Sequence, residues 1–119
     1  MAATSTEVVS RKDFQDQVLK ADVPVLVKFY GERCAYSREL APKLEQLAQE
    51  YAGKARFISV DTELSDRLDA DYRIKRTPTV MLFLDGQPVK RWTNEQNIRE
   101  YRRALGSLVE KVWGAEPVS

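Results

Sequence analysis

The segment "PVLVKFYGERCAYSRELAPKLEQLAQEYAGK", residues 24–54, joins a strand pattern directly to a helix pattern. Its run "VLVKFY" is short, β-branched and aromatic, which predicts a central strand in which Lys28 is the odd residue. Leucines at helical spacing then predict a long helix from Cys34 to about Tyr51, kinked at Pro42. The only cysteine of the chain therefore stands where a strand gives way to a helix.

The flanking sequence predicts further strands and helices. The expected elements are a helix over about 11–21 capped by Ser10, a strand over 55–61, a helix within 63–74, a hairpin over 77–92 that turns at Asp85 and Gly86, and a last helix over 94–113 capped by Asn94. This order predicts one α/β sheet flanked by helices. We expect a single domain over residues 1–119, with a core of about 8–112 and flexible tails.

Composition argues against several classes of function. The 19 Lys and Arg residues nearly balance 18 Asp and Glu residues, so no overall field draws the protein to nucleic acid or to a membrane surface. The absence of histidine removes imidazole-based triads and the usual zinc ligand, and we predict no metal and no cofactor. No apolar run approaches the roughly 20 residues of a membrane span. We expect a soluble monomer.

Cysteine usage bears on the compartment. One cysteine cannot form an internal disulfide, and the amino terminus "MAATSTEVVSRKDF" has no apolar core of signal-peptide length. Both features are typical of an intracellular protein in a reducing compartment. We therefore expect a cytoplasmic location.

The segment 24–54, the strand "FISVD", the run "RTPTVMLFLDG" and the closing helix together resemble a thioredoxin over about residues 8–112. The resemblance rests on linked features: Pro42 follows Cys34 by eight residues, and Pro78 lies 44 residues downstream of Cys34, before a strand. It implies the thioredoxin fold, a central mixed β-sheet flanked by helices on both faces.

The resemblance also implies how a partner is held. It places a cis peptide bond between Thr77 and Pro78, and it places this loop against Cys34 to hold an extended segment of the partner by backbone hydrogen bonds. A cis proline in a tight turn is physically reasonable. The residues expected to bind the substrate are Arg33, Ala35, Tyr36, Arg76, Thr77, Pro78 and Trp92. Trp92 is either an exposed contact near this groove or a core residue.

The chain departs from the family pattern at the reactive site. The thioredoxin motif usually has two cysteines, and Ser37 stands at the second position. Arg33 replaces the aromatic residue that usually precedes the first cysteine. Lys28 stands where a buried aspartate is usual, and Phe57 replaces the customary lysine partner of that aspartate. The ordinary interpretation of Lys28 is a side chain that snorkels from a strand end or pairs with a carboxylate.

One thiol is enough for the first step of disulfide exchange. Amide groups and the dipole of a helix N-terminus favour a thiolate, so we predict a pKa of Cys34 below the ordinary value of about 8.5, with Arg33 and Arg38 acting in the same direction. The Ser37 hydroxyl can donate a hydrogen bond to the sulfur. Cys34 can attack a disulfide, but Ser37 cannot resolve the product. Cys34 and Ser37 are thus the candidate catalytic residues.

These residues predict a thiol–disulfide oxidoreductase of the protein disulfide reductase or isomerase type, acting on protein thiols and disulfides. The resemblance implies a thioredoxin reductase or glutathione as electron donor. The motif Cys34-Ala35-Tyr36-Ser37 fits a natural monothiol form, and it equally fits a trap variant in which serine replaces the resolving cysteine of a dithiol parent.

Two other function classes remain open. In the first, the redox site has decayed and the groove beside Pro78 still grips a peptide, which gives a binding or scaffold protein. In the second, the chain is a monothiol glutaredoxin that holds glutathione or shares an iron–sulfur cluster. The run "RTPTVMLF" and the absence of a Gly-Gly element after it favour thioredoxin over glutaredoxin.

Several cations are expected in or near the loops around Cys34. This basic collar consists of Arg33, Arg38, Arg73, Lys75, Arg76, Lys90 and Arg91. Surface charge usually serves solvation alone. A functional collar would predict an acidic partner or the carboxylates of glutathione.

Overall fold

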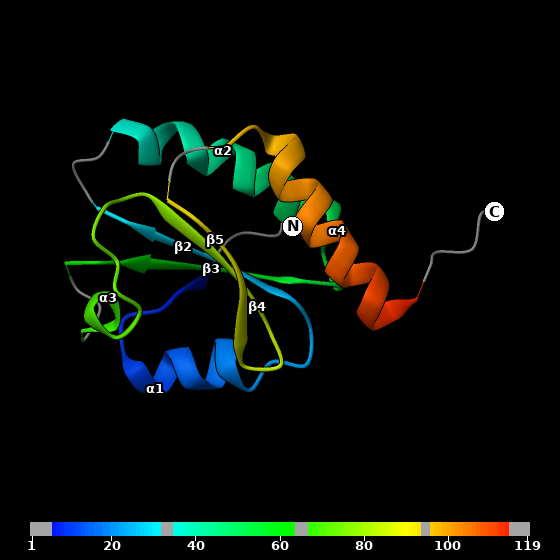
Figure 1. Ribbon diagram of the computed structural model, residues 1–119, viewed down its shortest axis with the longest axis horizontal. Helices are drawn as coiled ribbons and strands as arrows, with labels where there is room; N and C mark the ends of the chain where they lie inside the picture. Colours follow the sequence, from blue (N-terminus) through cyan, green and yellow to red (C-terminus); the bar gives the residue numbers. More distant parts are fainter. Residues whose placement is uncertain (1–5, 32–34, 64–66, 94–95, 115–119) are drawn as a thin grey trace.

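Five strands form one mixed sheet in the computed structural model, which describes residues 6–31, 35–63, 67–93 and 96–114, with the backbone alone for residues 35–39 (Figure 1). The strands are β1 (Thr6–Glu7), β2 (Val25–Tyr30), β3 (Arg56–Asp61), β4 (Thr79–Leu84) and β5 (Gln87–Trp92), in the order β1-β3-β2-β4-β5. β3 pairs in parallel with β1 and β2, whereas β4 pairs antiparallel with β2 and β5. The predicted central mixed sheet is confirmed.

Helices cover both faces of this sheet. They are α1 (Arg11–Phe14), which continues into a π-helical turn η1 (Gln15–Leu19), then α2 (Ala35–Glu50), α3 (Leu68–Asp71) and α4 (Ile98–Trp113). α1 and α3 lie on one face, and α2 and α4 lie on the other (Figure 1). Within the part of the chain that the structure describes, none of these helices has the length and apolar character to cross a membrane.

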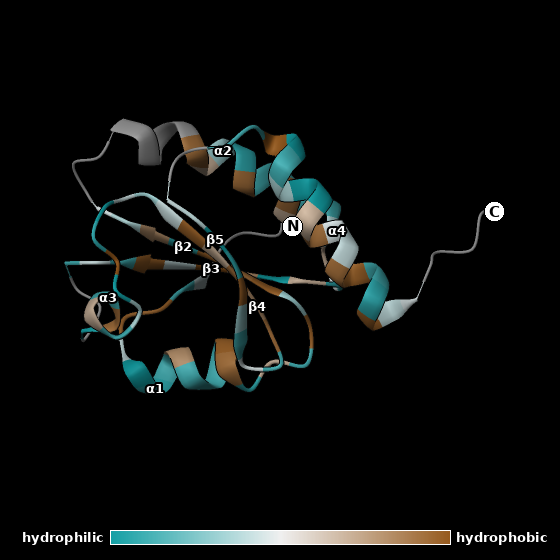
Figure 2. Ribbon diagram, viewed as in Figure 1, coloured by the Kyte–Doolittle hydropathy of each residue, from teal (hydrophilic) through white to brown (hydrophobic). Residues whose placement is uncertain are grey.

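Alternation along β2 supplies both cores. Successive side chains of a strand point to opposite faces. Val25, Val27 and Phe29 accordingly pack in the cluster under α1, whereas Leu26 packs in the cluster under α2 and α4. β2 lies between two other strands and is buried on both sides, which explains its nearly continuous apolar run. Figure 2 shows hydrophobic residues along the sheet and polar residues along the outer sides of the helices.

The turn between β4 and β5 confirms the predicted hairpin. Asp85 and Gly86 have φ values of 53° and 79°, as a two-residue turn of type I′ requires at both central positions. A Cβ at position 86 would lie 3.0 Å from the carbonyl oxygen of Leu19, so glycine is also required for space. The hairpin thus packs directly on the end of η1.

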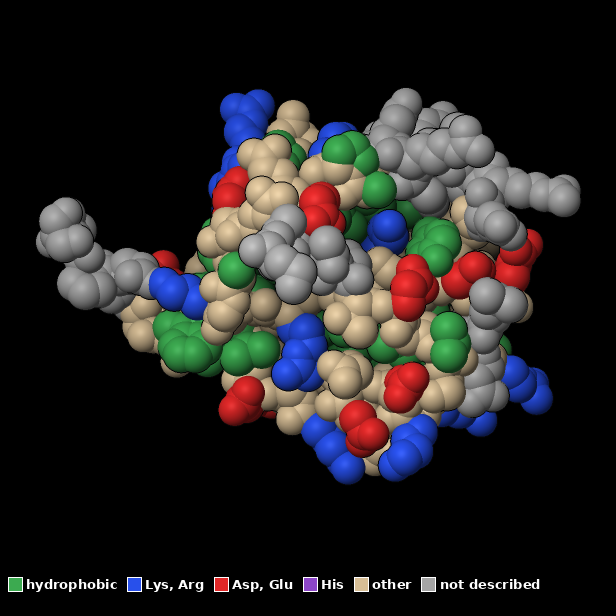
Figure 3. Space-filling model, turned by 180° about the vertical axis from the view of Figure 1, so that it is seen from behind, with side chains coloured by type: hydrophobic (Ala, Val, Ile, Leu, Met, Phe, Trp, Pro, Cys, Tyr) green, Lys and Arg blue, Asp and Glu red, His purple; other side chains and the backbone are tan. Residues whose placement is uncertain are grey.

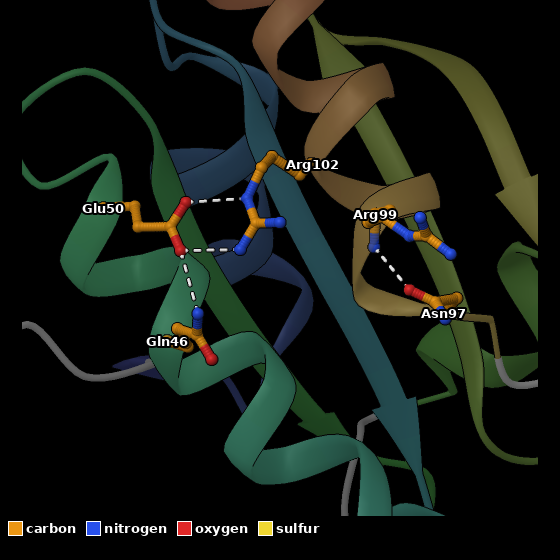
Figure 4. Close-up of polar contacts among 5 residues, drawn as sticks. All are labelled: Gln46, Glu50, Asn97, Arg99 and Arg102. Atoms are coloured by element: carbon orange, nitrogen blue, oxygen red, sulfur yellow. Dashed lines mark hydrogen bonds and ion pairs between the residues drawn. The ribbon is translucent and has the colours of Figure 1, made fainter.

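α2 and α4 are joined by a charged contact on their shared face. The guanidinium of Arg102 donates to both carboxylate oxygens of Glu50 at 2.8 Å, and the amide of Gln46 donates to the same carboxylate at 3.2 Å (Figure 4). The hydrogen bonds from Arg102 hold the pKa of Glu50 below its ordinary value. This bidentate pair fixes the end of α2 against the second turn of α4.

Two predicted helix caps had different outcomes. Ser10 caps α1 as predicted, because its Oγ accepts a hydrogen bond from the N–H of Asp13 at 3.1 Å. The prediction for α4 was wrong: the cap is Asn97, whose Oδ1 accepts from the N–H of Arg99 at 2.9 Å (Figure 4). Asn94 lies outside the described residues. Both asparagines precede the apolar periodicity, so sequence alone could not choose between them.

Three other elements differ from the predictions. In the described part of the helix expected within 63–74, the helical residues are those of α3, which ends at Asp71, and Arg73 beyond it takes a φ of 54°. Residues 64–66 lie outside the described residues. The helix over 11–21 is α-helical for one turn and π-helical for the next. β1 was not predicted, because two residues carry no periodicity and its partner strand is distant in sequence.

Candidate functional site at the carboxyl end of β2

The carboxyl end of β2 meets the amino end of β4 at one edge of the sheet. Phe29 pairs with Thr79 in an antiparallel register, so the residues after Tyr30 approach the residues before Thr79. Gly31 lies directly against Thr77: a Cβ at position 31 would be 3.1 Å from the Thr77 side-chain oxygen. The chain that leads from β2 toward α2 therefore contacts the loop that carries Pro78.

Sequence reasoning missed Gly31 as a site residue. A glycine directly after a buried strand can indicate a close approach of another part of the chain, and the sequence contains that signal. The signal does not say which segment approaches. Only the pairing of β2 with β4 identifies that segment as the one around Thr77.

The segment from Arg76 to Thr79 is held by its own contacts. The Thr77–Pro78 peptide bond is cis, the isomer that the family resemblance implies. Pro78 and Thr79 are buried, Thr77 is half-buried and Arg76 is exposed. The hydroxyl of Thr79 donates to the carbonyl oxygen of Arg76 at 2.7 Å. The structure thus brings three predicted binding residues, Arg76, Thr77 and Pro78, to the edge that Gly31 marks.

The predicted nucleophile, Cys34, lies outside the described residues. Cys34 and Arg33 are not described, and for Ala35, Tyr36, Ser37 and Arg38 the backbone alone is described. Cys34 directly precedes Ala35, the first residue of the 16-residue helix α2, and Ser37 belongs to the first turn of that helix. The first turn of a helix carries amide N–H groups without intrahelical acceptors. The lowered pKa of Cys34 and its hydrogen bond with Ser37 stay predictions.

Trp92 does not line a groove. Its side chain is 5% exposed and packs in the core between the sheet and α4, with its ring 5.0 Å from the ring of Tyr101 in an edge-on arrangement. Of the two interpretations of Trp92, the core one holds. Trp92 ends β5 directly opposite Val80, and the sequence pattern of an edge strand does not show which of its residues is covered by a helix.

Lys28 occupies the face of the sheet that α2 covers. It pairs with Val80, a member of the core cluster under α2 and α4, and its Nζ lies 4.9 Å from the centre of the Tyr30 ring. Burial lowers the pKa of the Lys28 ammonium below its ordinary value, while the carboxylates of Glu7 and Glu45 act in the opposite direction. Lys28 is therefore a half-buried cation stabilised by an aromatic ring and by nearby carboxylates.

Phe57 of β3 and Glu7 of β1 are two further residues of this part of the sheet. Phe57 is 6% exposed and belongs to the same core cluster as Val80, so it fills space by apolar packing. The Tyr30 hydroxyl donates to a Glu7 carboxylate oxygen at 2.8 Å, which links β2 to the edge strand β1. The α2 face of β2 thus carries a polar group next to an apolar core.

The basic collar is not one continuous surface. Lys90 pairs with Leu82 and Arg91 pairs with Met81, and these partners belong to the cores on opposite faces of the sheet. Lys90 lies 5.7 Å from the centre of the Trp92 ring, on the α4 side. These two cations of the collar therefore lie on opposite faces of the sheet, because adjacent residues of a strand point to opposite sides.

Arg91 has a structural partner. Its guanidinium donates to the carbonyl oxygens of Tyr72 and Arg73, the latter at 3.4 Å. These carbonyls follow the last residue of α3, where a helix has no further amide donors of its own. Arg91 therefore ties the edge strand β5 to the end of α3.

No metal site can be assembled from the residues that the structure describes. Among them, no group of three or more His, Cys, Asp and Glu side chains lies close enough together to hold an ion. The described residues supply the backbone of the first turn of α2 and, at this edge of the sheet, the loop from Arg76 to Thr79.

Comparison with known proteins gives a consistent result. The family model described as Thioredoxin matches residues 5–106. The chain is 38% identical to "Thioredoxin 1" of Nostoc sp. over 68% of its own length and 76% of that protein. It is 38% identical to "Thioredoxin C-2" of Corynebacterium nephridii over 75% of its own length and 82% of that protein.

Solved structures agree on the fold. A mutant thioredoxin from Halobacterium salinarum superposes with a TM-score of 0.82 at 24% identity, covering 99% of this chain and 96% of that one. Oxidised mitochondrial thioredoxin 3 from Saccharomyces cerevisiae gives a TM-score of 0.78 at 22% identity, covering 87% and 95% of the two chains. At these identities the similarity establishes the fold.

Proposed function

The chain belongs to the thioredoxin family of thiol–disulfide exchange proteins, and we propose that it is a monothiol member in which Cys34 is the attacking nucleophile. The observation that carries the proposal is the contact between Gly31 and Thr77. It joins the loop of Arg76, Thr77 and Pro78 to Gly31, which precedes Cys34 by three residues on the segment that leads to α2.

The first step is an exchange at sulfur. The Cys34 thiolate attacks one sulfur of a client disulfide, a bond forms between Cys34 and that sulfur, and the client disulfide bond breaks. The electron pair leaves on the other client sulfur, which takes a proton from solvent when it becomes a thiol. The result is a mixed disulfide between the client and Cys34.

Release of the client requires a second thiol, which Ser37 cannot supply. A thiol of the client can attack the mixed disulfide, which rearranges the client disulfides without net reduction. An external thiol, from glutathione or from a reductase, can attack the mixed disulfide instead. The client disulfide is then fully reduced once that donor has supplied two electrons. In both routes the Cys34 thiolate is regenerated.

The loop at Thr77 supplies the binding part of the proposal. The backbone at Arg76 and Thr77, which are exposed and half-buried, would hold an extended client segment by main-chain hydrogen bonds, as a strand added to a sheet edge is held. Arg76 and Thr77 would lie alongside that segment. Trp92 has no place in this binding set because it is buried in the core.

A native monothiol site fits the chain better than a replaced cysteine. Replacement of one cysteine would leave the strands untouched, yet Lys28 and Phe57 both depart from the family pattern under α2. Phe57 is packed in the core, and Lys28 has an aromatic contact and nearby carboxylates. Both residues are therefore integrated into the structure of the α2 face.

The proposal is tested by the rate of Cys34 alkylation with iodoacetamide as a function of pH. Because Cys34 is the only cysteine, every modified thiol reports on this residue. We expect a midpoint below the ordinary value of about 8.5 and formation of a mixed disulfide with a disulfide-bonded peptide. A Cys34→Ala variant is the control. A midpoint at or above the ordinary value, without mixed disulfide, would favour the scaffold alternative instead.

A further inference from the structure

Three exposed cations lie in the four residues that follow Tyr72. They are Arg73, Lys75 and Arg76, here called the basic loop. Among the residues that the structure describes, none of the three forms an ion pair with a carboxylate, whereas Arg11, Arg102 and Arg103 all do. Their charges are therefore available to a partner.

The backbone of the basic loop is fixed at both ends. Arg91 donates to the carbonyl oxygens of Tyr72 and Arg73, and the N–H of Ile74 donates to the Asp69 carbonyl oxygen at 2.7 Å. Ile74 packs against the core under α1. At the other end the Thr79 hydroxyl donates to the Arg76 carbonyl oxygen. A fixed backbone presents the three cations with a smaller loss of conformational entropy on binding than a loose loop would.

The acidic residue nearest to the basic loop in sequence is already paired. Both carboxylate oxygens of Asp71 accept hydrogen bonds from Arg11, at 2.7 and 2.6 Å. The basic loop holds three of the chain's 19 basic residues within four consecutive positions, and no acidic residue. By contrast, Lys and Arg are mixed with Asp and Glu over the face shown in Figure 3.

Neither strand protection nor backbone preference explains these residues. Lys90 and Arg91 lie on the edge strand β5, where charged side chains prevent unwanted strand pairing. The basic loop belongs to no strand. At position 73 the φ of 54° favours glycine or asparagine over arginine, so backbone preference does not account for a cation there.

We propose that the basic loop recognises an acidic segment next to the reactive sulfur of a client protein, and so makes exchange at Cys34 faster with acidic clients than with neutral ones. The inference rests on the proposed function of Cys34. The loop leads directly into Thr77, which contacts Gly31, so a client segment bound along Pro78 would pass beside Arg76 and Lys75. Local charge of this kind acts mainly on the rate of encounter.

The test compares two peptides that differ in charge alone. Each carries one cysteine as a mixed disulfide with thionitrobenzoate, flanked by glutamates in one peptide and by glutamines in the other. Attack by Cys34 joins its sulfur to the peptide cysteine and releases thionitrobenzoate, which is followed by absorbance. We expect the glutamate peptide to react on the order of tenfold faster at low salt, and this ratio to fall toward one at roughly 1 M salt.

The variants locate the effect on the loop. Lys75→Glu with Arg76→Glu should remove the preference, so that the ratio of the two rates falls to one or below. The control variant is Lys20→Glu with Lys111→Glu, which changes the net charge by the same amount as the loop variant. Lys20 is exposed near the start of β2, and Lys111 is exposed in the last turn of α4, which Trp113 links to Lys54 near the start of β3. Both therefore lie away from Gly31, and this control should keep the preference.

Two results would overturn the proposal: equal rates for the two peptides with the unmodified chain, or an equal loss of preference in the control variant. If thionitrobenzoate is released from neither peptide, the proposed function of Cys34 fails. The basic loop is then tested by NMR of the protein, into which a cysteine-free glutamate peptide is titrated. Shifts of the backbone amides of residues 73–77 and 79 that are lost in Lys75→Glu/Arg76→Glu support recognition, and their absence in the unmodified chain refutes it.

Discussion

Gly31 and Thr77 are in contact across the edge of the sheet, where a Cβ on residue 31 would lie 3.1 Å from Oγ1 and 3.9 Å from Cβ of Thr77. Gly31 belongs to the connection between β2 and α2, and Thr77 belongs to the loop before β4. The glycine therefore sets how closely the two parts of the candidate site approach each other.

We predict that Gly31→Ala destabilises the protein by about 1 kcal/mol, because the new methyl group overpacks against the Thr77 hydroxyl. In a Thr77→Ala background the same change should cost little or should stabilise, since alanine lowers the entropy of the unfolded chain. Urea unfolding of the four proteins of this double-mutant cycle gives the coupling directly. Additive effects would show that the two residues are not coupled.

Ser37→Cys should convert the single exchange step into a complete cycle. Position 37 is in the first turn of α2, and serine and cysteine differ by one atom, so we expect little change in stability. The variant should form an internal disulfide under mild oxidation and reduce insulin with dithiothreitol as donor, whereas the unmodified chain should accumulate as a mixed disulfide. Ser37→Ala is the control. A folded Ser37→Cys protein that neither oxidises internally nor exceeds background reduction would contradict the exchange function.

Lys28→Met should raise stability by about 1 kcal/mol at neutral pH, because methionine fills the same space without the cost of burying a charge. The pKa of Lys28 is lowered in the folded state, so between that value and 10.5 the unfolded chain binds more protons and the stability of the unmodified protein rises with pH. The advantage of the variant should therefore shrink across this range. Urea unfolding of both proteins at neutral and alkaline pH measures the difference, and a constant difference would exclude a lowered pKa.

Arg91→Met should loosen the connection between β5 and α3. It removes the donors to the Tyr72 and Arg73 carbonyls and keeps most of the apolar stem, so we expect a loss of about 1 kcal/mol. Hydrogen exchange should increase at the amide of Ile74, which follows these carbonyls. Lys75→Met, a change to an exposed cation in the same loop, should have a smaller effect, within about 0.5 kcal/mol. Equal effects of the two changes would show that the contacts of Arg91 add no stability.

The sequence alone predicted those elements that depend on interactions between residues close together in the chain. The apolar run of β2, the turn at Asp85 and Gly86 and the cap at Ser10 were all predicted, because each depends on dihedral preferences and on hydrogen bonds between near neighbours. The separation of Lys90 from Arg91 was also within reach of the sequence, since strand alternation alone places them on opposite faces.

Tertiary structure alone decided which distant residues meet. The contact of Gly31 with Thr77, the burial of Trp92 against Tyr101 and the use of Arg91 by the end of α3 all follow from the register of β4 between β2 and β5. A one-residue shift of register would turn each strand side chain to the other face, and no periodicity within a single segment specifies the register of its partner. The sequence therefore determined the parts of the candidate site, and strand pairing decided how those parts lie together.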